Sequence, residues 1–308
     1  MTFSEKIKSE LSVLETKKGC CQKAQSYGML LFGYSFTSSA IALHTVNKAV
    51  ADCYADLLVS LTGCIVTVTE VERDAAHDKT LYLVEVEDEN DRLAVLSFFS
   101  HQIKEQVLRI QRANFPGACC VRAFLRGCFM VCGSMIDPSK EYHLEFVVPY
   151  RQLAVDLQQL LSELGINARL TERSGSQVLY IKESEQIEDF LTLTGAVKSS
   201  LQLMEIKIVK DVRNKVNRMT NCETANIEKT VAASSSQVRD IEWIFEKKGK
   251  HYLPDSLQLV AELRLANPEL SLTELCEVSG LGLSKSGMNH RLKKISEIAA
   301  DGLNTSLK

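Results

Sequence analysis

The chain has 308 residues, 45% of them hydrophobic and 24% charged, as expected for a soluble globular protein of two or three domains. Its formal net charge of −3 excludes a global basic field, so any contact with nucleic acid must come from local patches. No window contains the roughly 18 apolar residues that span a membrane. The amphipathic start MTFSEKIKSEL is not typical of a signal peptide. We therefore expect a cytoplasmic protein without a membrane partner.

The first two-thirds of the chain contain an internal duplication. The segment CCQKAQSYG, which begins at Cys20, aligns with CCVRAFLRG, which begins at Cys119, with cysteines, a basic residue, an alanine and a glycine in register. We expect a first repeat at 1–105 and a second at 106–210. Two nearly all-apolar runs, at 26–34 and 125–133, each have a glycine in third position. Such runs predict two buried helices that pack closely about a pseudo-two-fold axis.

The rest of each repeat follows one order of patterns. A strand pattern leads into a helical pattern that ends at a glycine, and a pair of strand patterns and a closing helix follow. This αββαββα order predicts an α+β fold and not a doubly wound parallel sheet. The expected strands lie at 39–45, 65–72, 81–87, 142–148, 168–172 and 177–182, and the expected helices at 47–61 (before Gly63), 91–99, 150–164 (before Gly165) and 184–193.

Ten cysteines are present, but none forms a C-x₂-C pair with the partner pair that a zinc finger needs. We expect them to be reduced, small hydrophobic residues. For the adjacent pairs Cys20-Cys21 and Cys119-Cys120, core packing is the favoured interpretation, and a metal or redox cluster across the pseudo-dyad is the alternative. Successive helical residues point about 100° apart, so adjacent cysteines do not easily face one centre. We expect no metal and no cofactor.

The second apolar run, FLRGCFMVCGSMIDPSKEYHLEF, resembles the LAGLIDADG motif of homing endonucleases. In that family the acidic residue at the next-to-last position of each motif binds the catalytic divalent metal. The metal activates water for phosphodiester cleavage. Here the corresponding positions hold Gly33 and Cys132, and the sixth motif positions hold Leu31 and Met130. Asp137 is expected in a turn. The resemblance thus implies a saddle-shaped, LAGLIDADG-like domain with no catalytic residue.

A basic and polar connector is expected at 211–236. Its segment 231–236 is interpreted either as a flexible joint or as a helix weakened by serines. The amide and guanidinium groups of the connector suit phosphate and base contacts, and equally suit helix caps and hydrogen bonds between domains. The residues with these possible contacts are Arg213, Asn214, Asn217, Arg218 and Lys229.

The last domain, expected at 237–308, is predicted to be small and all-α. Ser271 and Glu274 form a capping box at the start of a short helix, and Gly280 and Gly282 end it. Ser284 then caps a second helix with an apolar inner stripe and a cationic outer face. This pattern is typical of a helix-turn-helix with a recognition helix, although an αα-hairpin with a solvated basic face would share it.

Three stretches of the second half resemble the WhiA family of sporulation transcription regulators from Gram-positive bacteria. They are RNKVNRMTNCETANIEKT at 213–230, LVAELRLANPELSLTEL at 259–275 and LSKSGMNHRLKKI at 283–295. That family joins a degenerate LAGLIDADG-type domain to a helix-turn-helix. The resemblance implies a DNA-binding regulator that is not an enzyme and that is linked to sporulation, cell division and chromosome segregation. It also implies double-stranded DNA and transcription machinery such as a sigma factor as partners, and a nucleoid-associated location.

A recognition helix enters the major groove with its N-terminal residues against the base edges. Asn289 and His290 are predicted to contact bases, Asn289 through the bidentate pairing with adenine. Cations farther along the helix are predicted to hold phosphates. The predicted DNA contacts are Ser271, Thr273, Ser284, Lys285, Ser286, Gly287, Asn289, His290, Arg291, Lys293 and Lys294.

Two alternative functions stay open at this point. The first is a metal-dependent DNA endonuclease that uses the duplicated domain, against which the missing carboxylates argue. The second is a protein-interaction platform, or a DNA clamp, formed by the duplicated domain. The basic strip at 109–112, with Arg109 and Arg112, permits a clamp.

Overall fold

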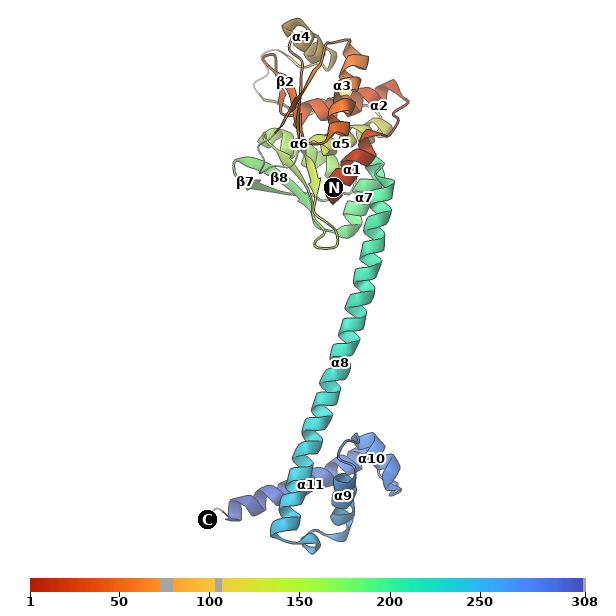
Figure 1. Cartoon of the computed structure of the whole chain (residues 1–308), viewed down its shortest axis with the longest axis vertical. Coiled ribbons are helices and arrows are strands. Elements are labelled where there is room, and N and C mark those ends of the chain that lie inside the picture. Colours follow the sequence, from red (N-terminus) through yellow and green to blue (C-terminus); the bar gives the residue numbers. More distant parts are fainter. Residues whose placement is uncertain (73–79, 103–106, 307–308) are drawn as a thin grey trace. The chain divides into compact units, whose positions relative to one another are not determined.

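The duplicated sequence folds as two copies of one arrangement of helices and strands (Figure 1). This computed structural model describes residues 1–72, 80–102 and 107–306. It divides into two units, Met1–Lys210 and Asp211–Lys308. The predicted boundary between the repeats, at residues 105 and 106, lies outside the described residues, as do the last two residues of the chain.

In each copy the order is helix, two strands, helix, two strands, helix, as predicted. A helix α1 (Phe3–Ser12) precedes the first copy, which contains α2 (Gly19–Leu31), β1 (Ser35–Phe36), β2 (Ile41–Thr45), α3 (Lys48–Thr62), β3 (Thr67–Val71), β4 (Leu81–Glu85) and α4 (Glu89–Phe98). A 3-10 turn η1 (Arg112–Asn114) precedes the second copy, which contains α5 (Ala118–Cys132), β5 (Gly133–Met135), β6 (Leu144–Val148), α6 (Arg151–Glu163), β7 (Arg169–Arg173), β8 (Ser176–Ile181) and α7 (Ser184–Thr194).

Each copy contributes one four-stranded sheet, and the two sheets have the same strand order. The orders are β1-β2-β4-β3 and β5-β6-β8-β7, with every pairing between these strands antiparallel. The glycines predicted to follow the middle helices, Gly63 and Gly165, have φ of +70° and +79°, a left-handed conformation that glycine adopts without steric cost. The predicted α+β class with pseudo-two-fold symmetry is therefore confirmed.

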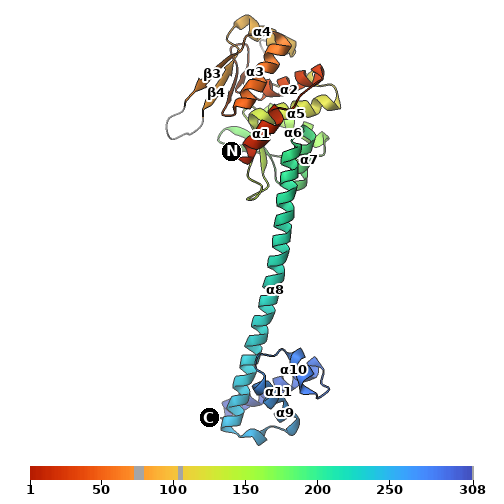
Figure 2. The ribbon, with the colours of Figure 1, turned by 45° about the vertical axis from the view of Figure 1, so that its right-hand side comes forward.

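The two predicted apolar helices, α2 and α5, lie side by side at the centre of the first unit (Figures 1 and 2). Their backbones meet at two glycines. A Cβ atom on Gly28 would lie 2.3 Å from the carbonyl oxygen of Phe124, and one on Gly127 would lie 2.2 Å from that of Gln25. Any larger residue would push the helices apart, so the glycines set the close approach. All residues of α2 from Ala24 onward are buried, as predicted for a helix that is apolar on nearly every face.

The second unit consists of helices joined by short turns in its described part. It contains the end of α8 (Val197–Lys247), a 3-10 turn η2 (Lys250–Tyr252), α9 (Asp255–Ala266), α10 (Leu272–Ser279) and α11 (Lys285–Ser306). Its core includes Ile241, Ile244, Val260, Leu275, Met288, Leu292 and Ile295.

Helix α8 settles one interpretation that the sequence left open. Residues 231–236 are helical, so this segment is a serine-containing stretch of helix and not a flexible joint. No glycine or proline occurs between Val197 and Lys247, and serine costs a helix only a few tenths of a kcal/mol, about 0.5 kcal/mol relative to alanine. Among the described helices, none has both the length and the apolar character needed to cross a bilayer.

Candidate nucleic-acid interface

The caps that the sequence predicted lie at the start of α10, in the turn that follows it and at the start of α11. Ser271 begins α10: its Oγ accepts a hydrogen bond from the Glu274 amide at 3.4 Å, and its own amide donates to the Glu274 carboxylate at 2.8 Å. Gly280 and Gly282 have φ of +61° and +62°, which allow the sharp turn. The Oγ of Ser284 then accepts a hydrogen bond from the Gly287 amide at 3.2 Å and caps α11.

One face of α11 is buried and the opposite face is polar. Met288, Leu292 and Ile295 are fully buried in the core of the second unit. Because a helix turns about 100° per residue, the residues between them point outward. The exposed set is Ser284, Lys285, Ser286, Asn289, His290, Lys293 and Lys294, with Gly287 and Arg291 partly exposed at its edges.

The cations on this face have no acidic partner within the described part of the protein. The ion pairs seen among residues 1–72, 80–102 and 107–302 join side chains of the first unit, and none of them involves a lysine or arginine of α11. The side chains of Lys285, Lys293 and Lys294 are therefore available to an external anion. On α10, Thr273 is exposed and Ser271 is partly exposed, so both can be reached from solvent.

A hollow of about 210 Å³ brings part of the predicted site together with α8. Ser271, Lys285 and Asn289 line one part of it, and Lys229 of the connector lines another. The other connector residues with predicted contacts lie 11 to 16 residues before Lys229, a distance of roughly 16 to 24 Å along a helix. The structure therefore does not bring them to the hollow; they are exposed on α8, and the residues are Arg213, Asn214, Asn217 and Arg218.

A buried arginine that was not among the predicted site residues connects the segments that line this hollow. Arg264 is 2% exposed, and burial lowers the pKa of its guanidinium. It donates hydrogen bonds to the carbonyl oxygen of Leu270 at 2.7 Å and to the Ser234 Oγ at 3.3 Å. It thus links the start of α10 to α8. Its position was visible in the sequence, because Arg264 follows Leu257 by seven residues and so falls on the apolar face of α9.

Gln237 is a second residue of the hollow that sequence analysis missed. Its amide oxygen is buried and has no hydrogen-bond partner among the described residues. A buried polar atom without a partner costs about 1–3 kcal/mol. The hollow therefore has an unmet hydrogen-bond acceptor, the Gln237 amide oxygen, beside Lys229 and Lys285, which suits an occupant that donates a hydrogen bond.

The ends of the two central helices of the first unit carry no acid. Cys132 is half-buried, its thiol donates to the carbonyl oxygen of Cys128 at 3.2 Å, and burial raises its pKa to about 12. A Cβ on Gly33 would lie 3.0 Å from the carbonyl oxygen of Met29, so this position is crowded as well. Asp137 lies in a turn, as predicted, and its carboxylate accepts a hydrogen bond from the Ser139 amide at 2.8 Å.

Both arginines of the basic strip at 109–112 are paired with acidic residues. Arg109 makes two hydrogen bonds of 2.7 Å to the Asp156 carboxylate. Arg112 bonds both carboxylate oxygens of Glu163, at 2.9 and 3.0 Å. These carboxylates offset the two positive charges, because each lies in direct contact with its arginine. The strip therefore lends no support to a DNA clamp in this unit.

Comparison with known proteins identifies the family. Residues 216–299 match the WhiA C-terminal HTH domain, and residues 121–213 match the WhiA LAGLIDADG-like domain. A Carboxydothermus hydrogenoformans protein named probable cell division protein WhiA is 37% identical over 303 residues, which cover 97% of each chain. The chain belongs to the WhiA family. A Bacillus cereus protein of the same name is 38% identical over 311 residues, which cover 97% of this chain and 96% of that one.

A solved WhiA structure agrees with this fold. The crystal structure of full-length WhiA from Thermotoga maritima is 27% identical, with a TM-score of 0.60 over 98% of this chain and 99% of its own. The resemblance to WhiA seen in three stretches of sequence is thereby confirmed. The match to the WhiA HTH domain begins at residue 216, within α8, so it includes both sides of the hollow that Lys229 and Lys285 line.

Proposed function

We propose that this WhiA-family protein is a sequence-specific DNA-binding transcriptional regulator that inserts α11 into the major groove. The observation that carries the proposal is the exposed polar face of α11, whose cations have no acidic partner in the described structure. Asn289 and His290 lie within the first two turns of this helix, where a recognition helix meets base edges. Lys293 and Lys294 lie one turn later, where they would hold phosphates.

The hollow beside α11 also supports an orientation in which the start of α11 faces the base edges of the major groove. Lys229, Lys285 and the start of α10 at Ser271 border it together. Two ammonium groups attract an anion, and on DNA that anion is a backbone phosphate. A phosphate there would fix the position of α11 along the groove. Asn289 would then face a defined base pair.

The names of the relatives support a proposal for the cellular context of this activity. They are called probable cell division proteins. We infer that the regulator acts on genes of cell division and chromosome segregation, or of sporulation, at sites on the nucleoid in the cytoplasm. Transcription machinery such as a sigma factor would be its protein partner.

A selection from random duplexes tests sequence-specific binding. The full-length protein is incubated with a pool of random double-stranded DNA at physiological salt, and bound duplexes are amplified and sequenced over several rounds. We expect one motif to be enriched, because base-edge contacts discriminate by about 1–3 kcal/mol per base pair. Retention of duplexes without any enriched motif would contradict a specific regulator.

We further propose that the LAGLIDADG-like unit has no nuclease activity. Gly33 and Cys132 stand where the family's metal-binding acids would be, and neither offers an oxygen ligand for Mg²⁺ from its side chain. Supercoiled plasmid incubated with the protein and Mg²⁺ or Mn²⁺ should stay supercoiled. Nicking that copurifies with the protein and that EDTA abolishes would overturn this part of the proposal.

A further inference from the structure

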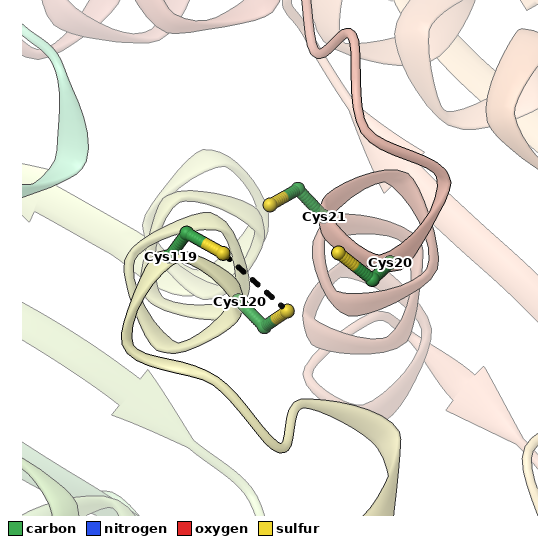
Figure 3. Close-up of side chains that lie close together, drawn as sticks. All are labelled: Cys20, Cys21, Cys119 and Cys120. Carbon is green, nitrogen blue, oxygen red and sulfur yellow. Dashed lines mark hydrogen bonds between the residues drawn. The ribbon is translucent and has the colours of Figure 1, made fainter.

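The four cysteines of the two adjacent pairs converge at one point. The Sγ atoms of Cys20, Cys21, Cys119 and Cys120 all lie within 4.8 Å of one another. Figure 3 shows the two pairs facing each other from the first turns of α2 and α5. The sulfurs of Cys119 and Cys120 are 3.9 Å apart.

This convergence corrects the expectation that adjacent cysteines would not face one centre. On each helix the two side chains still point about 100° apart. However, α2 and α5 approach so closely at Gly28 and Gly127 that the crevice between their first turns is bordered by all four side chains. The centre therefore forms between two helices, where each helix needs to supply only half of it.

Core packing explains only half of the cluster. Cys21 and Cys120 are buried, at 8% and 2% exposure, as the favoured interpretation predicted. Cys20 and Cys119 are exposed, and an exposed thiol gains little from apolar burial. Two solvent-exposed sulfurs directed at two buried ones suit a bound ion better than a core.

We propose that these four cysteines bind one zinc ion and form a structural site that joins the two repeats. A tetrahedral zinc ion with Zn–S bonds of about 2.3 Å holds its sulfurs roughly 3.8 Å apart. The sulfurs of Cys119 and Cys120 already have that spacing, and the others need to close by less than about 1 Å. An iron–sulfur cluster places several atoms between its ligands, so this close spacing favours a single ion.

Groups of positive charge lie close to the four sulfurs. The sulfurs lie at the positive ends of two helix dipoles, and neither α2 nor α5 has a side chain that caps its first amides. A hollow of about 360 Å³ that includes Cys21 and Cys119 is also lined by Lys17, Lys18 and Arg122. These charges offset the net negative charge of four thiolates on one divalent ion.

Such a site would fasten the two repeats across their pseudo-two-fold axis. Its ligands come in two pairs separated by 99 residues, so it lacks the sequence spacing of a zinc finger. All four positions are filled by protein, as in structural and not catalytic zinc sites. Loss of zinc is therefore expected to lower the melting temperature of the first unit, because binding energy at such sites contributes to folding.

Metal content of the full-length protein tests the site. The protein is produced without a metal-binding tag in zinc-containing medium and purified under reducing conditions. We expect about one zinc per chain by mass spectrometry of the metals. The exposed pair can be replaced without opening a core cavity, so Cys20→Ser with Cys119→Ser is expected to lose the zinc while keeping its circular dichroism spectrum. Cys222→Ser, at an exposed cysteine of α8, is the matched control and should retain it.

Cobalt gives a second measurement that does not depend on stability. The protein stripped of metal and then given Co²⁺ should show the visible absorption of tetrahedral thiolate coordination, and Cys20→Ser with Cys119→Ser should not. Four reduced thiols that bind neither zinc nor cobalt would overturn the proposal. Stoichiometric iron with inorganic sulfide, or a disulfide within the cluster under reducing conditions, would also overturn it.

Discussion

Gly28→Ala is expected to destabilise the first unit by about 2–3 kcal/mol or more, although alanine normally favours a helix over glycine by about 1 kcal/mol. The reason is the close approach of α2 and α5. The new Cβ would lie 2.3 Å from the carbonyl oxygen of Phe124, a distance that forces two backbones apart. Because the helices form the centre of the unit, the displacement would disturb the packing of both repeats.

Gly19→Ala is the matched control, since it makes the same change in the same helix. A Cβ at Gly19 meets no atom within 4 Å, so this variant should keep or slightly raise the stability. Urea unfolding followed by circular dichroism would compare the two variants, together with Gly127→Ala on α5. Equal stability of Gly28→Ala and Gly19→Ala would mean that the helix crossing is not as close as described.

Lys293→Gln with Lys294→Gln is expected to weaken DNA binding about 10- to 100-fold at physiological salt, and by the same factor on every sequence. Phosphate contacts carry no sequence information, so the preferred motif should stay the same. Each lost phosphate contact should also reduce the slope of log affinity against log salt by about 0.9, and the pair by about 1.8. Fluorescence anisotropy over a salt series measures both quantities.

Lys247→Gln with Lys248→Gln provides the control for net charge. It removes two adjacent exposed lysines from the same unit, at the end of α8. The affinity and the salt slope of this variant should stay close to those of the unchanged protein. If both double variants weakened binding equally, the contribution of α11 would be a general effect of charge and not a groove contact.

Local sequence patterns predicted most of the fold because they depend on nearby residues. The capping box of Ser271 with Glu274, the left-handed glycines Gly63 and Gly165, and the apolar stripe of α11 each act within one or two turns of helix. These features could be stated from the chain alone.

Features that depend on distant residues could not be predicted in this way. The basic strip permitted a DNA clamp in the sequence, yet Arg109 is paired with Asp156, a residue 47 positions away in the sequence. The cysteine pairs converge because two helices 99 residues apart cross closely. The link from Arg264 to Ser234 likewise joins α9 to α8 across 30 residues. In each case the contact depends on tertiary packing, and a local sequence pattern contains no information about which distant residues meet.

If α11 contacts base edges as proposed, Asn289→Ala should change the sequence preference of the protein. The selection from random duplexes is run in parallel for the unchanged protein, for Asn289→Ala and for Glu297→Ala, a control on an exposed residue farther along α11. We predict that Asn289→Ala loses preference at one base pair of the motif, an adenine, while Glu297→Ala keeps the full motif. An unchanged motif for Asn289→Ala, with the same preference at every position, would contradict the account.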